Sequence, residues 1–487
     1  MSADLMPPLT AKQITDDLTA PLFRKPSPLW ALGATAAGGL KMLLVFTIVM
    51  YVWTGYGIFN VNSTVGWGND IVSYVFWIGI AVAGTLVSSI LFLFRQKWRT
   101  GVNRSTEAMT VFAVNIAGLY PLIHTGRPWV DYWLIPFPWD HLALWPNFKS
   151  PIVWDVFAIT GYATTSVLFF ILGLIPDLAT VRDRCDASEV VKLGPVTIPL
   201  GKIRKMAYGS LCLGWKGTAS QWRHYERAYA QFAWIATPLV VGMHSTIATL
   251  LAVSMVPGWH ATIFPPYFVS GAIFGGLAMA LLLLVPLRAG FKLQRYITDD
   301  HFDNLAKIML GVGSIVLYVY VVEFYTAWYS QNRYEFAQFF EYRLFGPHAW
   351  SYWLMIFCNV VCLQLFWFKK LRRNMVALLF VGFMVNIGMW FERFNIIVLS
   401  LEHDQLPVNW NYYAFSPFDY LLLAGSFGLF FIQFLMFVRV APAVAIAEVK
   451  QTLLHKSHVR HQPLAHHQPL AHQQPPAHAG SPEAAHV

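Results

Sequence analysis

Charged side chains are scarce in this sequence. Asp, Glu, Lys and Arg make up 12% of the 487 residues, whereas apolar residues make up 56%. A soluble domain carries roughly 25% charged residues, so this chain has too few to cover a surface that faces water. The scarcity excludes an ordinary soluble globular protein and indicates an exterior that faces lipid.

Cysteine is also rare, and its spacing excludes several kinds of redox centre. The four cysteines are Cys185, Cys212, Cys358 and Cys362, and no CxxC or CxxCH motif joins them. Zinc, iron–sulfur and c-type haem sites depend on such groupings. We therefore expect no iron–sulfur cluster, no c-type haem and no disulfide framework on this chain.

Histidine is sparse inside the apolar stretches as well. Only His244 falls deep within one, whereas His124, His301 and His348 lie near the ends of theirs. A b-type haem between helices needs two histidines at similar depth, so we expect no haem on this chain.

Long apolar runs are what the sequence has in abundance. Ten of them approach the ~20 residues that cross a bilayer as a helix, and they are continuous rather than alternating. The first 30 residues lack an apolar core and predict a tail, not a signal peptide. The chain is thus predicted to be an all-α polytopic membrane protein. The expected spans are 37–59, 70–94, 105–124, 152–175, 228–254, 264–287, 305–327, 349–368, 374–398 and 418–438.

Basic residues are almost missing from every second loop between these runs. The loops 95–104, 177–227, 287–307 and 368–375 hold 21 Lys and Arg, whereas the alternating loops hold 4. Basic loops stay in the cytoplasm, so both termini are expected there. The net charge of +9 therefore reflects topology rather than nucleic-acid binding.

A weak repeat suggests how the spans are organised. Gly79, Ala83 and Gly84 of the second span recur 192 residues later as three glycines, and small residues suit close helix contact. Two four-helix bundles, of spans two to five and six to nine, are expected between the first and tenth spans. The expected segments are 1–36 (cytoplasmic tail), 37–69 (first span and outer loop), 70–254 and 255–398 (bundles), 399–445 (last outer loop and span) and 446–487 (tail).

Two segments outside the spans have a composition of their own. The basic segment 177–227 fits short interfacial helices or a docking surface for a neighbouring subunit. The tail 446–487 repeats HQPLAH and holds half of the 16 histidines. Such a tract can bind metal, but its proline-rich composition favours disorder.

Ionisable side chains inside a bilayer cost at least ~2.5–3.5 kcal/mol at the helix centre, so each needs a reason. Glu107 is expected to be an interfacial or capping residue. Glu392 and Arg393 are adjacent and could each pair with another helix, and a structural ion pair is the expected role. A hydrogen bond to a backbone carbonyl would satisfy His244. Glu323 lies among tyrosines and fits either a step of a proton path or a neutral packing residue.

A cluster of polar residues is expected at the outer ends of the second, third and fourth spans. A hydroquinone that loses two electrons also loses two protons, so it needs a base near each hydroxyl. A histidine and a carboxylate at slightly different depths suit that chemistry, and an apolar slot between helices would take the isoprenoid tail. The cluster contains Trp67, Asp70, His124, Arg127, Asp131, Asp140, His141 and Asp155.

Two stretches resemble the NrfD/polysulfide reductase membrane-subunit family. GWGNDIVSYVFWIGIAVAG (66–84) resembles its first bundle helix, and NIGMWFERFNIIVLSLEHDQLPVNWNYYAFSP (386–417) resembles its ninth-helix motif. WDVFAITGY and LGLIPDLA, within 154–179, narrow the resemblance to the ActC-type subunits of bacterial alternative complex III. The resemblance covers about residues 30–445.

That resemblance implies a subunit of a bacterial inner-membrane complex that oxidises quinol, with menaquinol as the first expectation, at the periplasmic face. Electrons would pass to a docked iron–sulfur subunit and on to multihaem and monohaem cytochrome c subunits, beside a second, ActF-like subunit. It implies His141 and Asp155 as the quinol-proximal bases. The implied shell is Trp67, Asp70, His124, Arg127 and Asp140. The implied proton path is His244, Glu323, Glu392 and Arg393.

Three alternatives stay open. A secondary transporter also carries intramembrane acids, but on helices broken at the midplane, whereas the spans here are expected to be mostly uninterrupted. A pure assembly subunit would anchor a redox partner without a site of its own. Quinone reduction is open as well, because the partner's potential sets the direction of electron flow.

Overall fold

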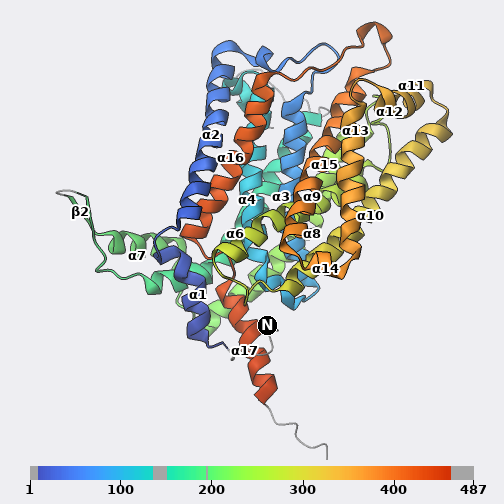
Figure 1. The fold of residues 1–487 in the computed structure, drawn as a ribbon. Helices are drawn as coiled ribbons and strands as arrows, with labels where there is room; N and C mark the ends of the chain where they lie inside the picture. The colour runs from blue at the N-terminus through green and yellow to red at the C-terminus, as the bar shows by residue number, and fades with distance from the viewer. Residues whose placement is uncertain (1–8, 135–150, 194–195, 462–487) are drawn as a thin grey trace, which may run out of the picture.

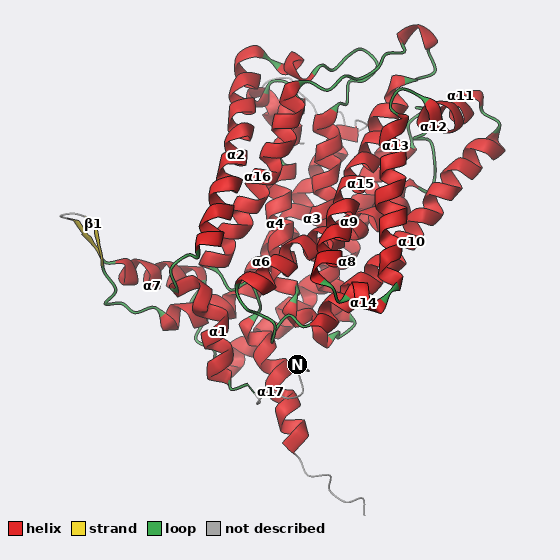
Figure 2. Cartoon of the chain, viewed as in Figure 1, coloured by secondary structure: helices red, strands yellow, loops and turns green. Residues whose placement is uncertain are grey.

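The computed structural model describes residues 9–134, 151–193 and 196–461. Over these ranges the chain is helical (Figure 2), apart from one short antiparallel hairpin of β1 (Val191–Leu193) and β2 (Val196–Ile198). Ten helices are long and apolar enough to cross a membrane. The all-α prediction with ten spans is confirmed.

The ten spans form where the apolar runs predicted them, with shifted ends. The first begins at Pro28 rather than near residue 37, because Ser27 caps the helix and proline suits its first position. Nine of the spans are α2 (Pro28–Thr54), α3 (Asn69–Leu93), α4 with α5 (Asn103–Ala117, Leu119–His124), α6 (Pro151–Arg184), α8 (Ala219–Ala252), α9 (Phe264–Gly290), α10 (Asp299–Ser330), α15 (Met375–Glu402) and α16 (Pro417–Val440).

The eighth span departs from the expectation of uninterrupted helices. It starts as α13 (Ala349–Ile356), continues as a π-helical turn η7 (Phe357–Val361) and ends as a 3-10 helix η8 (Cys362–Trp367). A second π-helical turn, η6 (Ala337–Tyr342), joins α11 (Arg333–Phe336) to α12 (Arg343–Phe345). Such turns are frequent at functional sites.

The centre of the protein is the contact between α3 and α9. A Cβ atom on Gly276 would lie 1.9 Å from the Cβ of Ala83, and one on Gly79 would lie 3.7 Å from the Cα of Ala272. Three of the six repeated small residues, Gly79, Ala83 and Gly276, therefore let these two helices touch, whereas the other three face α4 or α15. α8 and α15 each contact both central helices, while α4 packs on α3 and α10 on α9.

Two further helices lie side by side at the edge of the molecule, α2 and α16 (Figure 1). Glycines of α16 again allow the approach, because a Cβ on Gly425 would lie 2.4 Å from the backbone nitrogen of Leu44. The first and last spans are therefore paired with each other.

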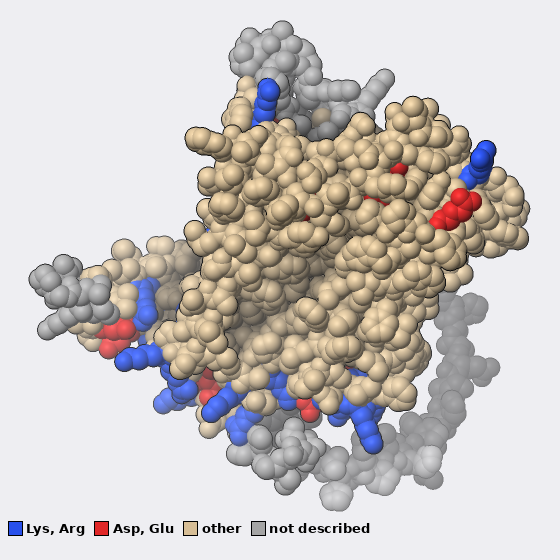
Figure 3. Space-filling view, turned by 45° about the horizontal axis from the view of Figure 1, so that its top comes forward, with Lys and Arg blue, Asp and Glu red and all other residues tan. Residues whose placement is uncertain are grey.

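The basic turns gather at one end of the molecule, which we call the basic end (Figures 1 and 3). It holds η3 (Lys97–Gly101), α14 (Lys369–Arg372), α7 (Leu200–Leu211), α1 (Ala11–Phe23) and α17 (Ile446–His461). The segment 177–227 thus contributes a short helix, as expected, together with the hairpin. The other end, called the opposite end, holds η2 (Tyr56–Phe59), η4 (Pro128–Leu134), α11, α12 and η9 (Pro407–Asn409).

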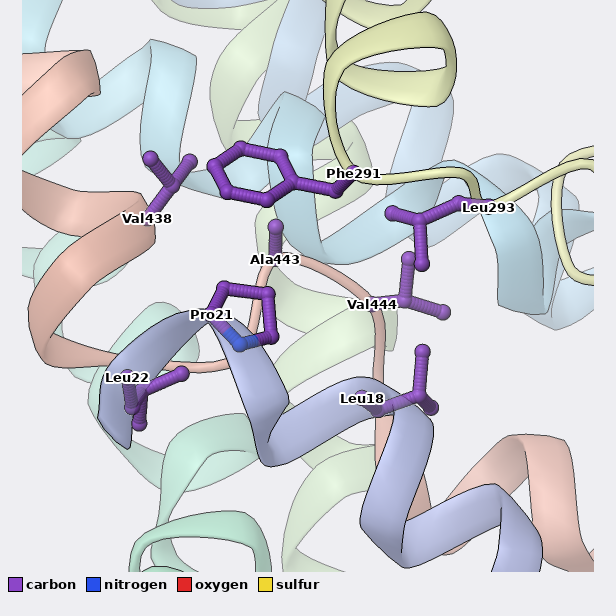
Figure 4. A pocket seen from close by; sticks show the side chains of 8 residues that line it. All are labelled: Leu18, Pro21, Leu22, Phe291, Leu293, Val438, Ala443 and Val444. Carbon is purple, nitrogen blue, oxygen red and sulfur yellow. The ribbon is translucent and has the colours of Figure 1, made fainter. Parts of the chain in front are cut away.

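Helix α1 is fixed to the basic end by apolar and polar contacts. Asp17 accepts a hydrogen bond from the hydroxyl of Tyr296 at 2.8 Å. Leu18 and Leu22 of α1 are buried against the bundle. They line a small cavity there (Figure 4). The cavity is lined by Leu18, Pro21, Leu22, Phe291, Leu293, Val438, Ala443 and Val444.

Replacing Gly276 by alanine tests the central contact. The new methyl group would overlap Ala83, so we expect a loss of about 1–3 kcal/mol of stability and a lower unfolding temperature of the purified protein in detergent. Gly311→Ala on α10 is the matched control, because its Cβ meets nothing within 4 Å. Equal unfolding temperatures for the two variants would show that α3 and α9 can move apart to accept the extra methyl group without a loss of stability.

Candidate functional site

Three side chains from three elements meet at the opposite end. Asp70 lies in the first turn of α3 and is fully buried. Tyr56 of η2 donates its hydroxyl to Asp70 Oδ2 at 2.7 Å. His124, the last residue of α5, places Nδ1 2.8 Å from that carboxylate oxygen and 2.9 Å from the Tyr56 hydroxyl. We call Tyr56, Asp70 and His124 the Asp70 triad.

Local backbone features bring the triad together. Gly55 ends α2 with φ of +93°, a conformation that a residue with a Cβ rarely adopts, and this turns Tyr56 toward α3. Asp70 stands at a helix N-terminus, where a negative charge is favoured. His124 follows α4 through the short helix α5.

The hydrogen bonds assign a role to each member of the triad. Burial and the charge of Asp70 raise the pKa of Tyr56 well above its ordinary value, so Tyr56 stays protonated and donates. His124 donates to Asp70 only if Nδ1 carries the proton, which leaves Nε2 as the acceptor. Its side chain is 25% exposed while Asp70 is enclosed. The triad therefore holds a reachable histidine base, oriented by a buried carboxylate.

A second carboxyl group lies further into the membrane region. Tyr74 donates its hydroxyl to Asp155 Oδ2 at 2.7 Å, and Asp155 Oδ1 is buried without a hydrogen-bond partner. Tyr74 follows Asp70 by one turn on α3, which places this pair about 6 Å deeper along the helix axis. His124 of α5 and Asp155 of α6 thus bind side chains at two successive turns of α3.

The other predicted members of the cluster are dispersed or undescribed. Trp67 packs against Trp259 at 5.4 Å, where the loop before α9 reaches α3. Arg127 is exposed beyond α5. Asp140 and His141 lie outside the described residues. Sequence reasoning missed Tyr56 and Tyr74, although the spacing of Tyr74 from Asp70 places both on one face of α3.

A second polar cluster lies between α10, α12 and α15. Glu323 Oε2 and Arg343 Nη1 are 4.0 Å apart, and both side chains are buried. A cavity of about 10 Å³ lies beside them. That volume is close to the minimum that holds one water molecule. The expectation of tyrosines around Glu323 is wrong in part, because Tyr318 and Tyr325 point outward and are exposed.

Glu392 and Arg393 form an ion pair with each other, so the expected structural ion pair lies within α15. Tyr320 of α10 donates to Glu392, and Arg393 lies over the ring of Phe268 at 4.7 Å. The ring of His244 packs on the same phenylalanine at 6.0 Å. Glu392 also lines the cavity beside Glu323, so the four expected positions of the proton path are neighbours.

A third cluster lies near the basic end and corrects the expected role of Glu107. Glu107 is buried rather than interfacial. Arg104 Nη1 lies 3.1 Å from Glu107 Oε2, and Arg104 Nη2 lies 3.1 Å from Asp177 Oδ2. The hydroxyls of Ser88 and Tyr229 donate hydrogen bonds to Glu107 Oε1 at 2.7 and 2.9 Å.

Helix α17 closes this cluster from the C-terminal side. Glu448 pairs with Arg99 at 3.1 Å and accepts a hydrogen bond from Asn103. The backbone of Ala447 donates to Asp177 at 3.1 Å. We call these residues, with Arg104 and Glu107, the Arg104 network.

Metal-binding groups are not assembled in the described ranges. No three side chains of His, Cys, Asp or Glu lie together there as a metal site, and the four cysteines are free and buried.

The fold and the sites define a multi-pass membrane protein with proton-accepting groups at one membrane end. The sequence model of the polysulphide reductase NrfD family matches residues 57–402. This range includes the Asp70 triad apart from Tyr56, the cluster around Glu323, and the Arg104 network apart from Ala447 and Glu448. The chain belongs to the NrfD family.

Two relatives carry functional names. The chain is 21% identical over 438 residues to one of the subunits of the selenate reductase of Mesobacillus selenatarsenatis, covering 87% of this chain and 96% of the relative. It is 24% identical over 277 residues to a Halobacterium salinarum protein provisionally named as a dimethyl sulfoxide reductase membrane subunit, covering 55% of each. These names fit a membrane subunit of an oxidoreductase complex.

Replacing Arg104 by methionine tests the buried network. Glu107 and Asp177 would lose their cation, and a buried pair broken on one side costs about 3–5 kcal/mol. We expect a large fall in the unfolding temperature of the purified protein. Restoration of that temperature by adding Glu107→Gln and Asp177→Asn would assign the loss to unpaired charge.

The matched control for that variant is Arg204→Met. Arg204 pairs with Glu189 in a partly exposed position, where an ion pair contributes about 0–1 kcal/mol. If the two single variants unfold at the same temperature, the Arg104 network contributes no more than a surface pair.

Proposed function

We propose that this chain is the quinol-oxidising membrane subunit of an oxidoreductase complex. The observation that carries the proposal is the Asp70 triad, with the Asp155–Tyr74 pair one helical turn deeper. Oxidation of a hydroquinone releases two protons and two electrons and leaves a quinone. The two proton acceptors differ in depth, so a ring entering from the lipid can present one hydroxyl to each.

The residues of the chain perform the proton steps. His124 Nε2 accepts one proton, and the negative charge of Asp70, 2.8 Å from Nδ1, stabilises the resulting imidazolium. Asp155 accepts the other proton through its unpaired Oδ1. Tyr56 and Tyr74 act as donors that fix the two carboxylates. The electrons leave for an acceptor that this chain does not itself supply.

The proposal extends to the surroundings of the site. Basic loops favour the cytoplasm, which puts the basic end and both termini there and the site at the periplasmic face of a bacterial inner membrane. His141 and Asp140 follow η4 in the sequence and belong to the proposed site, as do Trp67 and Arg127. An iron–sulfur subunit docked at the opposite end would take the electrons.

The particular assembly we propose is alternative complex III-like, with this chain in the ActC position. Multihaem and monohaem cytochrome c subunits and a second, ActF-like subunit would then be partners, and menaquinol would be the substrate. Proton translocation would use Glu323, Glu392 and Arg393, with His244 on the ring of Phe268 that Arg393 also contacts. The sequence motifs within 154–179 support this assembly.

The names of the two relatives favour a second candidate, the membrane subunit of a reductase complex. In that case the same quinol chemistry would feed a terminal reductase subunit. The two candidates share the Asp70 triad and differ only in the partner that takes the electrons.

Variants of the two proton acceptors test the site. In the purified intact complex, His124→Ala and Asp155→Asn are each expected to lower quinol oxidation by about 10²-fold or more, the usual contribution of a general base. Phe157→Leu, exposed on α6, is the control and keeps its turnover. Native gels verify that every variant complex retains all of its subunits. Normal turnover in both acceptor variants would leave the chain as an anchor without its own site.

The optical spectrum of the native complex tests the assembly. We expect the purified complex to show reduced-minus-oxidised absorbance of c-type haem and haem-staining subunits that co-migrate with this chain. A complex without haem that reduces selenate or dimethyl sulfoxide with a quinol as donor would support the second candidate instead.

A further inference from the structure

An apolar groove runs along the side of the molecule and is lined mainly by α9, α15 and α16. Figure 1 shows the arrangement of these helices, with α3 and α13 near them. The volume of the groove is about 420 Å³, within the usual range of small-molecule sites. Along α16 it extends from Asp419 to Phe431, about 18 Å of helix. Trp350, Phe383 and Tyr420 line it and are more than half exposed, so it opens sideways where lipid would lie.

One end of the groove is polar, and its polar groups are incompletely satisfied. Asp419 Oδ2 accepts hydrogen bonds from Tyr413 and from the backbone of Ser416, each at 2.8 Å. Asp419 Oδ1 has no partner, although the residue is only 1% exposed. Further along the groove, Asn386 also keeps a buried oxygen without a partner. Unsatisfied buried oxygens of this kind need a hydrogen-bond donor.

The lining restricts the class of ligand. None of the described residues that line the groove is Lys, Arg or His, and Asp419 stands at its polar end. A phosphate headgroup would find no cation there and would be repelled by the carboxylate. Aromatic side chains cover most of the remaining wall. The groove therefore suits a neutral molecule with a hydroxyl head and a long apolar chain.

The groove adjoins the Asp70 triad through the first turn of α3. Asn69 lines the groove, while the next residue, Asp70, belongs to the triad. Tyr413 joins the two sides, because its hydroxyl accepts from the backbone of Asn69 at 3.2 Å and donates to Asp419. Gly68 makes room for this tyrosine, since a Cβ there would lie 3.0 Å from its ring.

We propose that this groove is a second quinol site, which holds a quinol from the lipid with its hydroxyl head at Asp419 and its isoprenoid chain along α16. The identity of the ligand rests on the proposed function. No electron transfer occurs there, and the site raises the local supply of substrate beside the Asp70 triad. Neutral hydroxylated lipids share the same chemistry, and the experiment separates them from quinol.

Photolabelling of the intact complex tests the proposal. The probe is an azidohydroquinone with a decyl chain, and labelled peptides are mapped by mass spectrometry. We expect label on α15 and α16 at the groove and, separately, on α3 and α6 near Asp155. Excess decylhydroquinone should displace both, whereas dioleoylglycerol and phosphatidylglycerol should displace neither.

Bulky substitutions locate the labelled groove. Leu423→Trp on α16 and, independently, Ile387→Trp on α15 should each weaken groove labelling by about tenfold or more, while label near Asp155 persists. Met436→Trp, on the exposed side of α16, is the control. Both groove variants must elute as intact complexes.

Each remaining outcome overturns a different claim. Groove label that dioleoylglycerol displaces as well as decylhydroquinone does would make the groove a neutral-lipid site. The absence of groove label, or its survival in both tryptophan variants, would refute the second site and leave the oxidation site standing. Groove label without any label near Asp155, combined with normal turnover of Asp155→Asn, would refute the proposed oxidation site instead.

Discussion

Charges buried among apolar helices must find partners within the chain, and the structure depends on how they do so. An unpaired charge in such surroundings costs several kcal/mol. Arg104 is therefore enclosed by Glu107 and Asp177, and Glu323 faces Arg343. The contacts Arg104–Asp177 and Glu323–Arg343 join different helices, so these polar groups also fix the packing. Where an acid keeps an oxygen without a partner, as at Asp155, we infer that a ligand or a proton completes the site.

Helix α3 is the element on which both proposed sites stand. Its middle is occupied by small residues that meet α9, and its first turn carries polar side chains on opposite sides. Asn69 faces the groove with Asp419, while Asp70 and, one turn on, Tyr74 face His124 and Asp155. Close backbone contact with α9 fixes the centre of α3. The groove and the Asp70 triad, which share the first turn of α3, are therefore held at a constant distance from each other.

The spans could be predicted from the sequence because apolar length and loop charge are local properties. The small-residue repeat also pointed correctly to a helix contact. The pairing of charges could not be predicted, because partners such as Arg343 for Glu323 come from another element, and their meeting depends on helix rotation. The ion pair of Glu392 and Arg393, by contrast, could be predicted, because the two residues are adjacent in the sequence. The π-helical turns near Glu323 and the turn at Gly55 that delivers Tyr56 leave no periodic pattern. The roles of His141 and Asp140 remain predictions from the resemblance.

The Arg104 network has a consequence for how the protein is made. Its cation enters the membrane with the third span, yet Asp177 is translated later and Glu448, in α17, almost last. Until those acids have been synthesised, Arg99 and Arg104 have only Glu107 as a counterion within the network, and they can remain hydrated at the basic end. The packing of α4, α6 and α17 around Arg104 is therefore completed late in biosynthesis, and a chain truncated before α17 would lack Glu448, the partner of Arg99.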